Sequence, residues 1–188
     1  MDFLFGGYDE KKLRANLKMS VHRIKLQHNK ESNLTKVNKK NIAKLLQEGK
    51  VELARIKTEQ IIRTDDLLEA YGILELILEI LHERIHYISA STKDVPDDLK
   101  ESISSIVFAA KRLGIEELAT CSKHFKYKFG AEFIEMAEKN EGNCVNERLF
   151  NKISLLKIKA KLVNGYVRES WVMFRWPFLC SIVVIFHI

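Results

Sequence analysis

The first part of the chain has apolar residues at helical spacing and contains no glycine or proline from about Asp9 to Leu46. The apolar positions are Leu13, Leu17, Val21 and Ile24, followed by Leu34, Val37, Ile42 and Leu45. Intervals of three, four and seven residues place them on one narrow stripe of a helix. The polar stretch at 27–33 either arches over solvent or is locally weak. We expect the helix to end near Gly49.

A second long helix is predicted from about Val51 to Ile88. Its apolar residues alternate spacings of four and three and are Leu67, Tyr71, Leu74, Leu78, Leu81, Ile85 and Ile88. Ile73, Ile77 and Ile80 add a neighbouring stripe, so the second half of this helix is expected at the centre of the core. Because only a few residues around Gly49 join the two helices, they are expected to fold back as an antiparallel hairpin.

Shorter helices are predicted after the loop at 89–98. Apolar faces recur from Leu99 to Leu113, from Ile115 to Phe129, around Phe133 to Ala137, and from Val145 to Ile153. Gly114 and Gly130 separate the first three of these segments. No alternation typical of strands occurs before residue 155, so the predicted fold class is all-α, with shorter helices packed against the hairpin.

Both ends of the chain carry apolar residues. Near the start, Phe3, Leu4 and Phe5 form either a small wedge for a membrane surface or, as we favour, a segment tucked against the fold. The segment 171–188 is rich in apolar residues but is interrupted by Arg175 and Pro177. A tail anchor and a buried or strand-like tail are alternatives to the favoured interpretation, an atypical C-terminus.

The positive charge is concentrated in the first quarter of the chain. The chain has a formal net charge of +6, and residues 1–50 contain 12 Lys and Arg against 5 Asp and Glu, whereas the remainder is balanced at 19 against 20. A basic surface confined to one element is typical of proteins that bind polyanions: lipid headgroups, nucleic acid or an acidic protein. Three cysteines without a paired spacing favour a reducing, cytoplasmic environment.

The one motif with enzymatic spacing is the sequence from His82 to His86, which matches the H-E-x-x-H pattern of zinc proteases. His82 and His86 would be the metal ligands and Glu83 the general base. The sequence shows neither a third ligand in the expected context nor a substrate-binding strand. No glycine-rich phosphate loop or nucleophile motif occurs, so we expect no enzyme, no cofactor and no metal site.

Several strings along the chain resemble the increased-sodium-tolerance family, whose members are regulators related to ESCRT-III subunits. They are Leu13–Leu26, Ile42–Gly49, Ala54–Leu78, Asp98–Arg112, Lys126–Phe133 and Val145–Ser154, and they occur in the family's order. The resemblance implies an ESCRT-III-like helical domain over 1–154 and a short helix over 155–170, followed by the atypical apolar tail at 171–188.

The resemblance also implies a function in endosomal sorting into multivesicular bodies, membrane remodelling or scission, and cytokinesis. The implied partners are ESCRT-III subunits, the AAA ATPase that disassembles their filaments, an anionic membrane surface, and a homo- or hetero-polymer. The family's ATPase-recruiting motif is not recognisable here, which weakens the expectation of direct ATPase contact.

The residues expected to contact membrane or polymer lie on the basic first helix and are Lys11, Lys12, Arg14, Lys18, Arg23 and Lys25. The resulting hypothesis is a non-enzymatic protein, cytoplasmic and peripheral on endosomal membranes. The alternative is a basic helical protein that binds nucleic acid, although the sequence lacks a helix-turn-helix spacing or an aromatic stacking platform.

Overall fold

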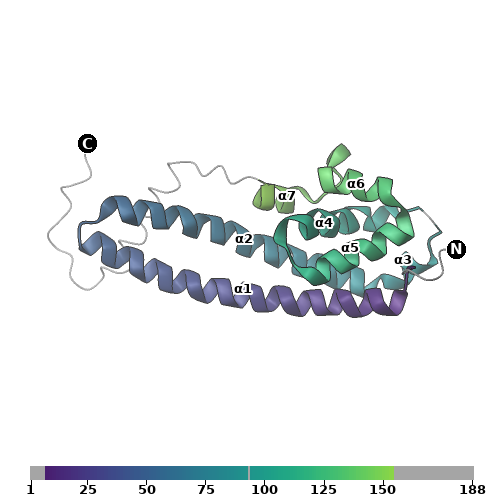
Figure 1. The fold of residues 1–188 in the computed structure, drawn as a ribbon, viewed down its shortest axis with the longest axis horizontal. Coiled ribbons are helices and arrows are strands. Elements are labelled where there is room, and N and C mark those ends of the chain that lie inside the picture. Colours follow the sequence, from purple (N-terminus) through teal and green to yellow (C-terminus); the bar gives the residue numbers. More distant parts are fainter. Residues whose placement is uncertain (1–6, 93, 155–188) are drawn as a thin grey trace. The chain divides into compact units, whose positions relative to one another are not determined.

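The computed structural model describes residues 7–92 and 94–154, and all regular structure in these ranges is helical (Figure 1). The elements are α1 (Glu10–Gln47), α2 (Val51–Glu83), α3 (Ile85–Ala90), α4 (Asp97–Leu113), α5 (Glu116–Phe129), α6 (Ala131–Lys139), a 3-10 turn (Glu141–Asn143) and α7 (Glu147–Ser154). The predicted all-α fold class is therefore confirmed. The expectations for residues 3–5, 155–170 and 171–188 lie outside the described residues.

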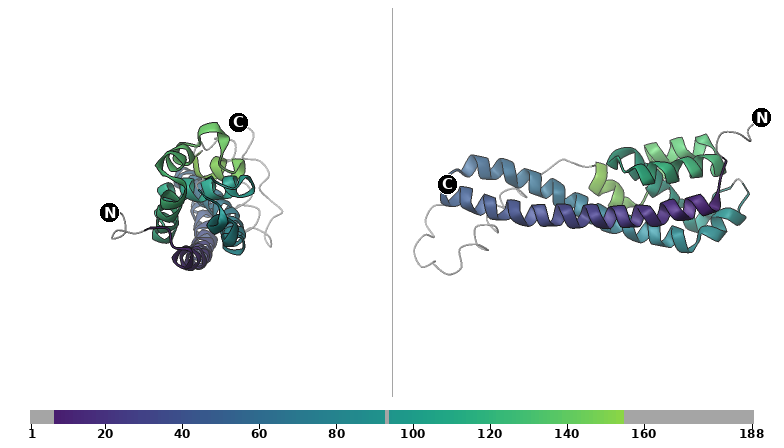
Figure 2. Two further views of the ribbon diagram at one scale, coloured as in Figure 1. Left: turned by 90° about the vertical axis from the view of Figure 1, so that its right-hand side faces the viewer. Right: turned by 60° about the horizontal axis from the view of Figure 1, so that its bottom comes forward.

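The chain divides into two compact units. Of the described residues, 7–30, 66–92 and 94–154 form the first unit, here called the body, and 31–65 belong to the second, here called the turn unit. In each unit a part of α1 runs antiparallel to a part of α2, as the hairpin prediction requires (Figure 1). In the body, α4 packs against α5, α6 and α7, and these helices lie on one side of the α1–α2 pair (Figure 2).

Backbone and capping interactions set the helix boundaries. The Asp9 carboxylate accepts a 3.1 Å hydrogen bond from the Lys12 amide, which caps the start of α1. At the other end, the amide of Lys50 donates to the carbonyl of Leu45 and the amide of Gly49 to that of Leu46. This pair of bonds is the Schellman arrangement, and it requires the left-handed φ of +75° that Gly49 adopts. Gly114, which ends α4, also has a left-handed φ of +64°.

The core of the body is made mainly by faces of α1, α2, α3, α4 and α5. Its fully buried side chains include Leu13, Leu17, Ile24, Leu74, Leu78, Leu81, Ile85, Ile88, Ile103, Ile106, Phe108, Leu118 and Phe125. Except for Phe108, which faces Phe150 of α7, they all follow the predicted stripes. Ile77 of the neighbouring stripe is buried too, but Ile80 is exposed.

Two details of the hairpin differ from the sequence prediction. The second long helix is broken at Arg84, whose φ of −96° and ψ of 18° separate α2 from α3. The break preserves the burial of Ile85 and Ile88. In α1, Leu34 and Val37 are exposed, whereas Thr35, Ile42 and Leu46 are buried. Thr35, Ile42 and Leu46 follow Ile24 at successive intervals of 11, 7 and 4 residues, so they lie on the same face of the helix as Ile24. Leu34 and Val37 lie outside that face.

Ion pairs connect helices of the body. Arg23 of α1 donates from Nε and Nη2 to Oε1 of Glu117 in α5, at 2.9 and 2.7 Å. Lys25 of α1 lies 3.2 Å from carboxylates of both Glu75 and Glu79 in α2. Lys152 of α7 contacts Asp66 and Glu69 of α2 at 2.7 and 2.9 Å. Ion pairs as well as apolar packing therefore hold α1 and α7 against the other helices of the body.

A pair of neighbouring leucines on α2 tests the assignment of the core. Leu78 is fully buried and Leu76 is 63% exposed. Leu78→Ala should lower the free energy of unfolding by about 2–5 kcal/mol, because it leaves a cavity in the core. Leu76→Ala should change it by less than about 0.5 kcal/mol. Urea denaturation followed by circular dichroism measures both, and equal losses would contradict the assignment.

The Arg23–Glu117 pair predicts a pH-dependent contribution to stability. The hydrogen bond from Arg23 lowers the pKa of Glu117 below its ordinary value. Glu117 therefore binds its proton more readily in the unfolded chain than in the folded one. The pair stabilises the fold fully above about pH 4.3, the ordinary pKa of a glutamate, and this contribution is lost as the pH falls through the lowered pKa of the folded state. Arg23→Ala should thus reduce unfolding free energy more at pH 7 than at pH 3. The matched control is Arg148→Ala, at an exposed arginine of α7, whose effect should not depend on pH in this range. A pH-independent effect of Arg23→Ala would argue against the assigned role of the pair.

Candidate functional site

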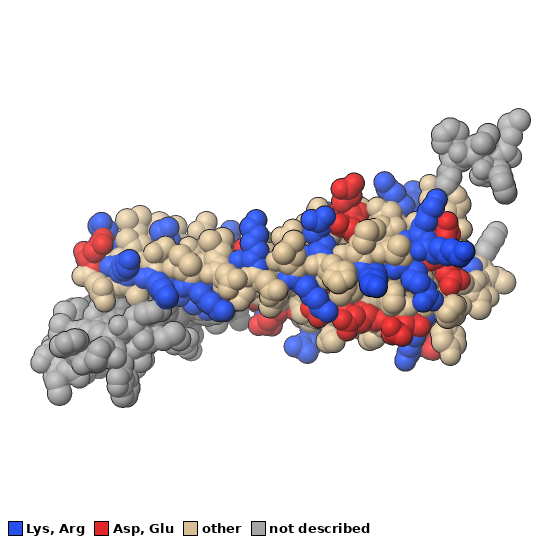
Figure 3. Space-filling model, turned by 90° about the horizontal axis from the view of Figure 1, so that it is seen from below, with Lys and Arg blue, Asp and Glu red and all other residues tan. Residues whose placement is uncertain are grey.

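The solvent-facing side of α1 is basic and carries few acidic residues. Lys11, Lys12 and Lys18 are exposed, and Lys30 lies at the end of the body's part of the helix. Figure 3 shows Lys and Arg side chains along α1, with a row of Asp and Glu side chains on the neighbouring surface of the body. The buried stripe of α1 is narrow, so most of the circumference of this helix faces solvent, and its basic side chains lie there.

The structure separates the six predicted contact residues into two groups. Arg23 and Lys25 pair with carboxylates of α5 and α2, as described above. Arg14 Nη2 lies 3.0 Å from His86 Nε2 and 3.8 Å from the Glu10 carboxylate. These three cations are engaged by the body itself.

The other three are open to a partner. The nearest carboxylate to the Lys12 ammonium group is that of Asp9, at 3.9 Å, and the Lys12 side chain is 74% exposed. Within the described residues, the side chains of Lys11 and Lys18 form no ion pair. Lys11, Lys12 and Lys18 are therefore the members of the predicted set whose charge is most available to an external anion.

Two exposed apolar side chains of α1 accompany these lysines and are not among the contact residues predicted from the sequence. Met19 is 49% and Leu26 64% exposed. They are seven residues apart, so they lie two helical turns from each other on the same side of α1. Both lie outside the helical face that carries Leu13, Leu17 and Ile24. An apolar residue outside the buried face indicates exposed apolar surface, and this position in the sequence pattern would have identified both.

The turn unit has a similar composition on its part of α1. Lys36 and Lys40 are exposed there, and so are the apolar residues Leu34 and Val37. The core of this unit is small and consists of Ile42, Leu46, Ala54 and Ile61 with Leu45 packed against it. A combination of exposed lysines with apolar side chains suits a surface that contacts both anionic headgroups and the apolar boundary beneath them.

The H-E-x-x-H motif does not form a metal site in the described part of the chain. His82 belongs to α2 and His86 to α3, so the break at Arg84 lies between them. His86 Nδ1 faces the Glu10 carboxylate at 3.3 Å, and His82 Nδ1 lies 3.4 Å from that of Glu83. Among the described residues, no group of three or more His, Cys, Asp or Glu side chains is placed to hold a metal ion.

Cys121 and His124 of α5 have no features of a nucleophile and its base. Both are buried, and burial raises the pKa of the Cys121 thiol to about 12, which keeps it protonated near neutrality. Its sulfur lies 3.9 Å from the Ser20 hydroxyl. Burial also lowers the pKa of His124, and within the described residues its Nδ1 has no hydrogen-bond partner.

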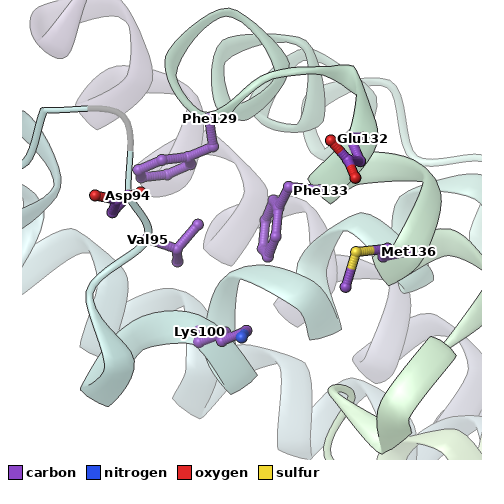
Figure 4. A pocket seen from close by; sticks show the side chains of 7 residues that line it. All are labelled: Asp94, Val95, Lys100, Phe129, Glu132, Phe133 and Met136. Carbon is purple, nitrogen blue, oxygen red and sulfur yellow. The ribbon is translucent and has the colours of Figure 1, made fainter.

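A shallow hollow of about 230 Å³ opens in the body between α4, α5, α6 and the loop before α4 (Figure 4). Val95, Phe129, Phe133 and Met136 supply its apolar walls, and its remaining lining residues are Asp94, Lys100 and Glu132. The rings of Phe129 and Phe133 meet edge to face with centroids 6.0 Å apart. The hollow combines apolar surface with charged side chains but contains no histidine, cysteine or serine.

No helix within the ranges 7–92 and 94–154 is both long enough and apolar enough to cross a membrane.

Comparison with known proteins relates this structure to one family. The family model described as "Ist1: Regulator of Vps4 activity in the MVB pathway" matches residues 14–170. An IST1-like protein of Dictyostelium discoideum is 39% identical over 158 residues, which cover 81% of this chain and 41% of that protein. The vacuolar protein sorting-associated protein IST1 of Saccharomyces cerevisiae is 28% identical over 166 residues, covering 84% of this chain and 55% of that protein. The chain thus spans about half the length of these curated relatives.

The fold is also similar to a solved structure. The crystal structure of the S. cerevisiae Ist1 N-terminal domain in complex with the Did2 MIM motif superposes with a TM-score of 0.80 at 25% sequence identity, and the match covers 90% of this chain and 94% of that one. The range that the family model matches, 14–170, includes α2 to α7 as far as Ser154 and nearly all of α1. The chain belongs to the Ist1 family.

Proposed function

We propose that this chain is an ESCRT-III-associated adaptor in the sorting of proteins into multivesicular bodies, and that it acts by binding and not by catalysis. The observation that carries the proposal is the structural match to an Ist1 domain that was crystallised with a short motif of another protein, Did2. The family's description as a regulator of Vps4 activity supports the same pathway. The buried, protonated Cys121 and the separated His82 and His86 give no support to an enzymatic alternative.

The proposed protein partners are ESCRT-III subunits. By analogy with the Did2 complex, we expect the helical domain of this chain to bind a short segment of such a subunit and to co-assemble with it. We propose that the chain influences the AAA ATPase in concert with these subunits, in line with the family's description as a regulator of Vps4 activity. The role in membrane scission and cytokinesis belongs to the same proposal.

The proposed membrane contact is the solvent-facing side of α1. The open cations Lys11, Lys12 and Lys18 would lie against anionic headgroups of the cytoplasmic leaflet, and Met19 and Leu26 would reach the apolar boundary. Each lysine near such a surface adds roughly 1 kcal/mol to binding. The chain would then be peripheral on endosomal membranes, with a contact that weakens as salt rises.

Charge reversal on α1 tests the membrane contact. The full chain should sediment with vesicles containing phosphatidylserine at low salt, should bind neutral vesicles poorly, and should be released by high salt. The triple variant Lys11→Glu, Lys12→Glu and Lys18→Glu should lower the affinity for the anionic vesicles by roughly a hundredfold or more, because three favourable charges become repulsive. Addition of a purified ESCRT-III subunit should increase the bound fraction of the unmodified chain.

The matched control carries the same number of reversals elsewhere in the body, at Lys100, Lys123 and Lys126, which are exposed. It should bind anionic vesicles nearly as well as the unmodified chain. Equal losses in both triple variants would mean that net charge, and not the α1 surface, governs binding. If single-stranded or duplex nucleic acid displaced the chain from vesicles at equimolar charge, the nucleic-acid alternative would replace the membrane proposal.

A further inference from the structure

The hollow between α4, α5, α6 and the loop before α4 has apolar walls that the described elements cover only in part. Phe129 is 9% exposed, and Val95, Phe133 and Met136 are half-buried. In Figure 4 the side chains of Val95, Phe129 and Phe133 point toward one another across the space. A cavity of about 150 Å³ is large enough for benzene, so the hollow, at about 230 Å³, has room for one phenyl ring.

The start of the described chain is anchored beside the segments that line this hollow. The Tyr8 hydroxyl shares a 2.7 Å hydrogen bond with the Ser89 hydroxyl. The Lys128 ammonium group lies 4.9 Å from the centroid of the Tyr8 ring and donates a 3.0 Å hydrogen bond to the Ser89 carbonyl. Lys128 directly precedes Phe129 of the hollow, and Ser89 lies at the end of α3, just before the loop to α4. Figure 1 shows the start of α1, α3 and the junction of α5 with α6 at the same end of the body.

The sequence that precedes Tyr8 suits an occupant of this space. From position 3 to position 7 it reads Phe-Leu-Phe-Gly-Gly. Two consecutive glycines let a chain reverse direction, because they have no Cβ atom to hinder the turn. At 3.3–3.6 Å per residue, the Cα atom of Phe5 lies within about 11 Å of that of Tyr8, and the Cα atom of Phe3 within about 18 Å. The anchor at Tyr8 therefore keeps both phenyl rings within reach of Phe129.

We propose that the segment at residues 3–5 docks in the hollow of its own chain. Alternate side chains of an extended segment face the same way, so Phe3 and Phe5 face the hollow and Leu4 faces away from it. One ring fills the space between Phe129 and Phe133, and the other covers its edge. The driving force is the removal of apolar surface from water. The lysines of the proposed membrane contact take no part, so this inference goes beyond that role.

The docked segment has two consequences for binding. It covers the apolar walls of the hollow, so any partner that binds there must first displace it. It also keeps two phenyl rings away from a bilayer, although Lys11 and Lys12 of α1 follow only a few residues later. The segment is thus an intramolecular cover and not a membrane wedge.

The reactivity of a thiol in the hollow measures the docking. Met136→Cys is introduced into the full chain in a background without the native cysteines, and its reaction with a maleimide reagent is followed in the absence of membranes. Addition of Phe3→Ser and Phe5→Ser should raise the reaction rate at least about tenfold, because a position that is covered most of the time becomes open. The matched control, Leu4→Ser, should change the rate by less than about twofold, since this side chain faces away from the hollow.

Two further measurements show that the protection arises in the hollow and within one chain. Glu135→Cys places a thiol at an exposed position of α6 that does not line the hollow. Its reaction rate should be the same with and without the two phenylalanines. The rate at position 136 should also be independent of protein concentration, because the occupant belongs to the same chain.

The proposal is overturned if the double phenylalanine variant leaves the rate at position 136 unchanged, or if Leu4→Ser raises that rate as much. Protection that increases with protein concentration would overturn it too, because the occupant would then be a second copy. If the double variant lost binding to vesicles containing phosphatidylserine but kept the same thiol rate without them, the segment would be a membrane wedge. Failure of the α1 charge reversals to weaken vesicle binding would contradict only the membrane role.

Discussion

The body of this protein depends on the burial of a narrow stripe of α1. Leu13, Leu17 and Ile24 are fully buried against the other helices, and each contributes about 1.5–3 kcal/mol through removal of apolar surface from water. Because this buried stripe is narrow, it determines the rotation of α1 about its own axis but covers only a small part of the helix surface. Most of the circumference of α1 is left for contacts with other molecules, and the basic residues lie there.

The cations of α1 serve two physical purposes. Arg23 and Lys25 are matched by carboxylates of α5 and α2, and they help to orient α1 in the body. Lys11 and Lys18 have no such match within the described residues. Even a paired exposed lysine stabilises a fold only weakly. Lysines that have no such partner are therefore best explained by contacts with other molecules. The same helix therefore combines a structural role with the membrane and partner contacts that we propose.

Periodicity was sufficient to predict the hairpin because both helices repeat their apolar residues over many turns. The main stripe of α2 is an example, since Leu74, Leu78 and Leu81 are all fully buried. Prediction failed where the pattern was sparse. Thr35 is buried instead of Leu34 because position in the helical phase outweighs hydrophobicity at a single residue. The break at Arg84 has no proline or glycine to mark it.

The site was harder to predict than the fold. The sequence located the basic helix but could not separate open from engaged cations, because the partner of Arg23 is Glu117, 94 positions away. The apolar pattern also failed to identify the exposed residues Leu76 and Ile80 of α2. Ile80 was expected in the core, but it is 43% exposed. Such surfaces depend on which faces the other helices cover, and a single stripe pattern does not specify that.

The central claim is that the solvent-facing side of α1 is the surface that meets the membrane. An environment-sensitive fluorophore attached to a cysteine at position 19 or 26, in a background without the native cysteines, tests it directly. With anionic vesicles, the emission of labels at Met19 and Leu26 should shift to the blue and return at high salt, and a label at exposed Tyr127 on α5 should not respond. A vesicle-bound protein whose α1 labels remain in water, or whose label at position 127 alone responds, would contradict the account.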